Sequence, residues 1–149
     1  MSDYDTDILE WSERQSALLR RLAAGENIND QIDWPNIIDE VETVGRSECA
    51  ALRSHIAVVL EHLMKLQASP SQDPRAGWKV TVIRARRDIE RSVEDSPSLR
   101  AVVAGMIADE MPSILAGATL AAHGEQPRVE IDGLTYSQDQ VLGAWFPEG

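Results

Sequence analysis

Two histidines and a lysine are the first residues to consider for chemistry. His55 and His62 lie seven residues apart in the stretch from Trp34 to Gln67, and Lys65 follows three residues after His62. On a helix this spacing places the histidines on one face about 10 Å apart along the axis, too far apart to bind one metal ion together. The HExxH arrangement is absent. The sequence therefore predicts hydrogen-bonded structural histidines, with no metal and no cofactor.

Glu48 and Arg86 are the charged residues that we expect to meet inside the protein. At about 100° per residue, Glu48 falls within the apolar arc of its helix, and Arg86 lies about 20° from Val93 on the apolar side of the next one. Because an unpaired buried charge costs several kcal/mol, we predict that Glu48 and Arg86 form a buried salt bridge, which His55 could join. If it lined a cavity, this pair would be an anion or substrate clamp.

The candidate ligand-binding residues are therefore Glu48, His55, His62, Lys65 and Arg86. No nucleophile motif accompanies them, because GxSxG is absent and the only cysteine, Cys49, has no nearby base to form a thiolate. The sequence assigns no catalytic residue. In an enzyme, His62, Glu48, Lys65 and the arginines of the third helix would be inspected first as acid, base and anion clamp.

The stretch from Trp34 to Gln67 must position most of these residues, and its pattern predicts one long inner helix. Its apolar residues advance by threes and fours: Ile37, Val41, Val44, Leu52, Ile56, Val59, Leu63 and Leu66. The phase survives across Gly45. We therefore expect a single helical run over 36–66 that bends at Gly45 rather than ends there.

Three further main helices are predicted from capping residues and prolines: Asp7 to about Ala24, Asp73 to about Glu94, and Leu99 to Ala122. Trp78 leads the apolar face of the third helix, so we predict that it is a core anchor. Pro112 removes a backbone hydrogen bond, so the fourth helix should bend or divide in two. The predicted fold is an all-α, single-domain bundle of four main helices over residues 1–149.

The end of the chain has a different pattern. Val129–Ile131 and Leu134–Tyr136 flank Asp132-Gly133, which allows a small hairpin over 128–136 that would have to lean on the helices. Ser137 and Gln140 then predict a capping box for a short C-terminal helix.

The charge is uneven. Residues 1–66 carry 13 acidic and 6 basic side chains, residues 67–100 carry 5 and 7, and residues 101–149 carry 7 and 1, within a formal net charge of −11. An acidic body repels phosphate backbones and anionic lipids, so we expect no nucleic-acid and no membrane partner. The arginines of the third helix are interrupted by Asp88, Glu90 and Glu94 and are interpreted as solvated or internally paired. The acidic N-terminus, the lone cysteine and the lack of a long apolar run predict a cytoplasmic protein.

Five short motifs, in order, resemble the bacterial family called domain of unknown function twenty-nine: Asp39-Glu40-Val41-Glu42, Gly45-Arg46-Ser47-Glu48, His62-Leu63-Met64-Lys65, Trp78 with Arg86-Arg87 and Ile89, and Asp95-Ser96-Pro97-Ser98-Leu99. The resemblance spans nearly the whole chain and implies a compact, all-helical bacterial domain. It implies no activity, because the family has none assigned.

Two classes of function are compatible with these observations. The first is a protein-interaction or self-association module. Its partner would be another protein or a second copy of the chain, most simply in a two-fold dimer. The second is a small enzyme or anionic-ligand binder that uses the Glu/His/Arg cluster. An exposed apolar patch would favour the first, whereas a pocket lined by His62 and arginines would favour the second.

Overall fold

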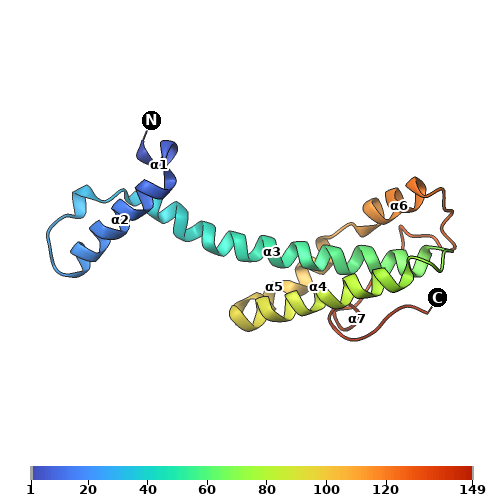
Figure 1. The fold of residues 1–149 in the computed structure, drawn as a ribbon. Coiled ribbons are helices and arrows are strands. Elements are labelled where there is room, and N and C mark those ends of the chain that lie inside the picture. The colour runs from blue at the N-terminus through green and yellow to red at the C-terminus, as the bar shows by residue number, and fades with distance from the viewer. Residues whose placement is uncertain (1, 149) are drawn as a thin grey trace. The chain divides into compact units, whose positions relative to one another are not determined.

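The computed structural model describes residues 2–148, and every regular element in them is helical (Figure 1). The α-helices are α1 (Asp3–Thr6), α2 (Ile8–Ala23), α3 (Trp34–Ala68), α4 (Arg75–Asp95), α5 (Arg100–Asp109), α6 (Pro112–Ala122) and α7 (Gln138–Leu142). Short 3-10 turns span Asn29–Gln31 and Pro97–Leu99. The predicted all-α class is confirmed.

The contacts divide the chain into two compact units, Met1–Ser47 and Glu48–Gly149. We call them the N-terminal unit and the C-terminal unit. The prediction of one domain over 1–149 stays a prediction. Each unit has its own set of buried side chains.

In the N-terminal unit, α2 begins and ends where the sequence predicts. The side chain of Asp7 caps the helix by accepting a hydrogen bond from the backbone N–H of Glu10 at 3.0 Å. Gly25 follows the helix with φ +95°, a left-handed conformation that suits glycine. On the side of α2 that faces the start of α3, Trp11 and Gln15 are buried.

Helix α3 runs unbroken from Trp34 to Ala68, so the predicted single helical run is confirmed. Its apolar face is not buried along the whole length. Leu52 and Ile56 have no exposed surface, whereas Val41 and Val44 are 68% and 67% exposed. The prediction that Val41 and Val44 belong to an inner face is therefore wrong.

The length of α4 explains where the burial in the C-terminal unit begins. Two contacts fix the antiparallel register of α4 on α3: His55 lies beside Asp88, and the Lys65 ammonium lies over the ring of Trp78. Continuing this register places Asp95, the last residue of α4, opposite Glu48. Within the C-terminal unit, α4 thus runs along α3 from about Glu48 to Lys65.

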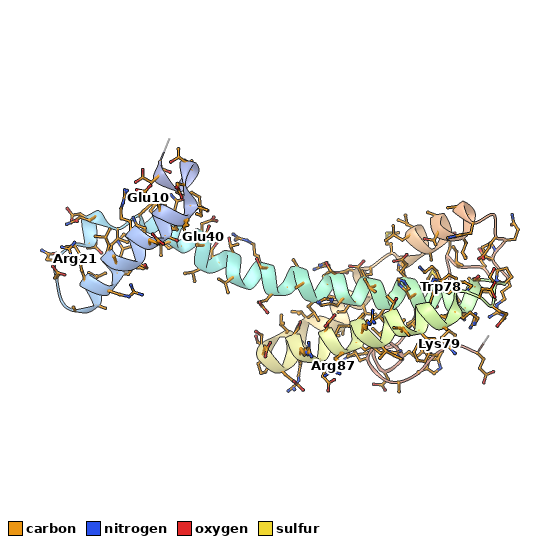
Figure 2. The ribbon with its side chains drawn as sticks, viewed as in Figure 1. Glu10, Arg21, Glu40, Trp78, Lys79 and Arg87 are labelled. Carbon is orange, nitrogen blue, oxygen red and sulfur yellow. The ribbon has the colours of Figure 1, made fainter. Side chains whose placement is uncertain are left out.

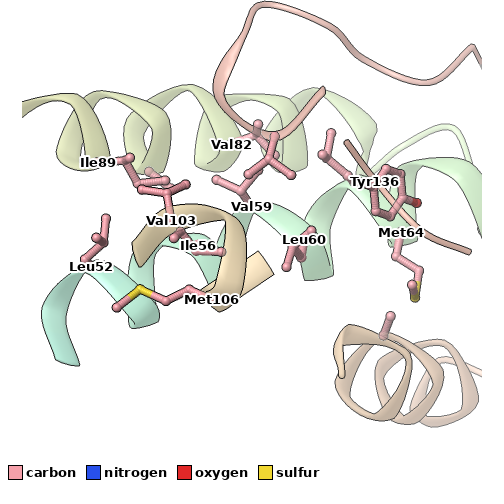
Figure 3. Close-up of a cluster of buried hydrophobic side chains, with 14 of the residues drawn as sticks. Leu52, Ile56, Val59, Leu60, Met64, Val82, Ile89, Val103, Met106 and Tyr136 are labelled. Carbon is pink, nitrogen blue, oxygen red and sulfur yellow. The ribbon is translucent and has the colours of Figure 1, made fainter. Parts of the chain in front are cut away.

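The core of the C-terminal unit lies between α3, α4 and α5 (Figure 3). Its fully or nearly fully buried side chains include Leu52, Ile56, Val59 and Leu63 of α3, Val82 and Ile89 of α4, and Val103 and Met106 of α5. Helix α7 adds Val141. Burial of this many large apolar side chains is the main source of stability in the unit.

Trp78 lies outside this core. Its side chain is only half-buried, and its ring faces the Lys65 ammonium, which lies 5.2 Å from the ring centroid. The prediction that Trp78 is a core anchor is therefore wrong. Trp78 instead covers a buried cation, and Val82, one turn further along α4, leads the buried face.

Pro112 divides the predicted fourth helix into α5 and α6, as the sequence indicates. The two helices meet at an angle of 53°, and Pro112 occupies the first turn of α6, where its missing N–H costs nothing. Among the described residues no single helix is long and apolar enough to cross a membrane. The bent pair Pro97–Asp109 and Pro112–Ala122 meets that test by length and composition only.

The hairpin over 128–136 does not form, because residues 2–148 contain no strand. Instead, Ile131 and Leu134 pack against the core, and an added Cβ at Gly117 of α6 would lie 3.0 Å from Ile131 Cδ1. The backbone N–H of Arg128 donates to the carbonyl of Ala68 at the end of α3. Contacts with the helices thus replace strand pairing.

The short last helix is confirmed. Ser137 and Gln140 form the predicted capping box of α7, with each side chain accepting a hydrogen bond from the backbone N–H of the other residue.

Candidate functional site

The five predicted site residues do not form one cluster. Glu48 is exposed on α3 and forms no salt bridge among residues 2–148. The predicted salt bridge between Glu48 and Arg86 is therefore wrong. The register of α3 and α4 gives the reason, because Glu48 lies opposite Asp95, nine residues or about 13 Å along the helix from Arg86.

Arg86 points toward the C-terminal segment. Its guanidinium donates to three backbone carbonyls, those of Gln140 at 2.7 Å, Val141 at 2.8 Å and Trp145 at 2.6 Å. It also lies 4.9 Å from the ring centroid of Phe146. Burial lowers the pKa of Arg86. Arg86 therefore holds the end of α7 and the following residues against α4 through its Nε and Nη2 atoms.

His62 and Lys65 do meet, and they share a buried site with Glu61 and Trp78. The His62 Nδ1 atom lies 2.8 Å from the carbonyl of Val58, so Nδ1 carries the proton. The Nε2 atom then accepts from the Lys65 ammonium at 3.3 Å, and Glu61 lies 3.6 Å from the same ammonium. Burial, with Lys65 as a further cause, lowers the pKa of His62 and favours the neutral ring.

The Lys65 ammonium occupies the centre of this small site. Lys65 is 6% exposed, and its ammonium is surrounded by a carboxylate, an imidazole nitrogen and an aromatic face. The ammonium therefore has its partners within the protein, and the arrangement is structural. His55 lies apart from it, with Nδ1 3.9 Å from the Asp88 carboxylate. Within residues 2–148 no group of three or more His, Cys, Asp or Glu side chains could hold a metal ion.

A second candidate site is a groove in the C-terminal unit. It has a volume of about 1020 Å³ and lies between α4, the start of α5, and α7 with the residues after it. Its apolar lining comes from Ile83, Ile89, Val93, Val103, Leu142 and Phe146. Its charged lining comes from Arg86, Arg87, Arg91, Arg100, Glu90 and Glu94. Figure 2 shows Arg87 on α4, on the same helix as Trp78 and Lys79.

The sequence did not reveal this groove. Arg87 and Arg91 were interpreted as solvated or internally paired, and they are exposed without a salt bridge in the described part of the chain. The groove is lined by arginines but not by His62. The sequence signal that could have indicated the groove was the net basic charge of residues 67–100 in an otherwise acidic chain.

Helix α6 exposes an apolar face in the same unit. Its 11 residues include no charged side chain, and only Ala116 and Leu120 are buried. Ile114 and Leu115, together with Met111 just before the helix, are 63%, 58% and 67% exposed. We call these three residues, with the exposed Ala118, Ala121 and Ala122 that continue the same side, the α6 face.

A protein-family model described as "Domain of unknown function DUF29" matches residues 4–128. The match begins within α1, includes α2 through α6 and ends at Arg128, before α7. No curated protein and no solved structure matches the chain significantly.

Proposed function

Because the chain belongs to the DUF29 family, whose description assigns no activity, we propose from its surface that it is a self-association module. The observation that carries this proposal is the α6 face. A helix without charged residues is normally covered on all sides, yet three large apolar side chains are more than half exposed here. Burying them against another protein surface gains free energy in proportion to the area removed from water.

A second copy of the chain is the partner that fits this face. An uncharged face meets its own copy without like-charge repulsion, and the alanines allow two helices to approach closely. The dipole of α6 favours an antiparallel arrangement, because the N-terminal end of each helix then lies beside the C-terminal end of the other copy.

The size of the face sets the expected strength. Eleven helical residues extend over about 16 Å, so two such faces bury less than the roughly 1,200 Å² of a standard stable interface. We therefore expect a weak, concentration-dependent dimer rather than a permanent one.

The alternative, an enzyme or anionic-ligand binder, was based on Glu48, His55, His62, Lys65 and Arg86. Only His62 and Lys65 contact each other, Arg86 is engaged by backbone carbonyls, and Glu48 is exposed. Ligand binding by these residues stays a prediction, but the cluster on which it depended is not assembled.

Sedimentation equilibrium over a wide range of protein concentration tests the proposal. We expect wild-type protein to shift from monomer to dimer, and Ile114→Glu to raise the dissociation constant at least tenfold by placing like charges in the interface. Val41→Glu is the matched control, because Val41 is equally exposed but lies on α3. A monomer at every concentration, or a dimer that Val41→Glu disrupts and Ile114→Glu does not, would overturn the proposal.

A further inference from the structure

The groove between α4, α5 and α7 has a firmly held wall. The three hydrogen bonds from Arg86 to the carbonyls of Gln140, Val141 and Trp145 fix the residues that form this wall, and Phe146 stacks on the same guanidinium. The groove is therefore a built feature of the C-terminal unit. A preformed site spares a ligand part of the ordering cost of binding.

The remaining arginines of the groove have no acidic partner in the described part of the chain. Arg87, Arg91 and Arg100 are exposed, and none of them forms a salt bridge within residues 2–148. With Arg86, four arginines face two glutamates, so the lining is net positive in a chain of net charge −11. Guanidinium groups bind carboxylates through paired, charge-assisted hydrogen bonds.

The two glutamates narrow the choice of anion. Glu90 and Glu94 lie on α4 between and beyond Arg87 and Arg91, so a continuous row of phosphates along the groove would meet two carboxylates. A peptide does not have this problem, because it can place single carboxylates opposite single arginines. The apolar lining, including Ile83 at 56% exposure, supplies a surface for its apolar side chains.

We propose that this groove binds an acidic segment of a partner protein that also carries apolar side chains. Its volume of about 1020 Å³ lies at the upper end of small-molecule sites, so it suits a short stretch of polypeptide better than a small metabolite. Carboxylates of the segment pair with Arg87, Arg91 and Arg100, and its apolar side chains pack between Ile83 and Phe146. This surface is separate from the α6 face and does not depend on self-association.

Selection from a random 12-residue peptide library displayed on phage tests the proposal with the full-length chain. We expect the retained pool to be enriched in Asp, Glu and large apolar residues. A synthetic peptide from that pool, labelled with fluorescein, should lose at least tenfold in affinity for Arg91→Glu and for Ile83→Asp. The matched control is Arg84→Glu, the same charge reversal at an exposed position of α4 outside the groove.

The outcomes separate a specific groove from general charge attraction. Normal binding by Arg84→Glu together with loss in Arg91→Glu supports the groove, provided that circular dichroism shows all variants folded. A pool rich in Lys and Arg, a pool without compositional bias, or equal losses in the Arg84 and Arg91 variants would overturn the proposal. Measuring the same peptide with Ile114→Glu keeps the test independent of the α6 face.

Discussion

The N-terminal unit is held by hydrogen bonds that converge on Asp33, whereas the C-terminal unit is held by an apolar core. In the first, the indole N–H of Trp11 donates to the Asp33 carboxylate at 2.9 Å, and the backbone N–H of Asp33 donates to the side chain of Gln15 at 2.9 Å. In the second, one continuous cluster of buried side chains is made mainly of Leu, Ile and Val. Stability in the two units should therefore respond to different changes.

The difference follows from what α3 meets on each side of Glu48. Downstream, α4 and α5 cover its apolar face and exclude water. Upstream, the described residues of the N-terminal unit bury Trp11, Ile28 and Ile32 together with the polar Gln15. Hydrogen bonds contribute less net stability per contact than burial of a large aliphatic side chain, so the N-terminal unit should be the weaker of the two.

The largest expected effect comes from a cavity in the C-terminal core. Ile56 has no exposed surface, so Ile56→Ala should lower the free energy of unfolding by about 2–5 kcal/mol. Val41→Ala, on the uncovered part of the same helix, should stay within about 0.5 kcal/mol of wild type. Urea denaturation followed by circular dichroism measures both. Similar losses for the two variants would contradict the division of α3 into covered and uncovered parts.

The second-largest effect is expected at Arg86, which holds residues 138–146 against α4. Arg86→Met removes a guanidinium that donates to three carbonyls, and hydrogen bonds of charged groups contribute about 1.5–3 kcal/mol. We expect a loss of about 2–3 kcal/mol and faster hydrogen exchange over 138–146, with the amides around Ile56 still protected. Arg87→Met is the control, because Arg87 is exposed. Unchanged exchange over 138–146 would show that Arg86 does not hold this segment.

Asp33 should make the N-terminal unit sensitive to acid. Hydrogen bonds from the Asn36 amide and the Trp11 indole lower the pKa of Asp33 below its usual 3.8. A lowered pKa in the folded state means that this contribution to stability is complete above roughly pH 4 and is lost as the pH falls through the folded-state pKa. The indole N–H signal of Trp11 in NMR spectra should report this loss. In Asp33→Asn the response should disappear, and a persistent response would assign it to another group.

The helices themselves could be predicted because their signals are local. Asp7, Pro112 and the Ser137/Gln140 pair each fix an element end through contacts within a few residues, and all three are confirmed. The phase of the apolar residues across Gly45 likewise gave the continuity of α3.

The predictions that were wrong depend on which segments of the folded chain contact each other. Trp78 lies opposite Lys65 rather than over the aliphatic core, and the 128–136 segment packs on helices instead of on itself. Helical periodicity in the sequence gives the direction in which a side chain points from its helix. It does not give the residue of the neighbouring helix that lies at the same position along the axis. The groove and the α6 face escaped prediction for the same reason, since both are surfaces that other helices leave uncovered.

Glu48 gives the sharpest test of this distinction between angle and axial position. Its angle on α3 points toward the apolar side, and a buried partner of Arg86 would cost about 3–5 kcal/mol to remove. The structure instead places it opposite the end of α4, exposed, where the two units of the chain adjoin in sequence. Glu48→Ala should therefore change the free energy of unfolding by less than about 0.5 kcal/mol, the smallest effect considered, because no contact of the C-terminal core is lost. Chemical denaturation of Glu48→Ala beside Arg86→Met measures the contrast: a large loss in the Arg86 variant with none in the Glu48 variant fits carbonyl binding by Arg86, whereas matching losses of several kcal/mol would restore the buried salt bridge.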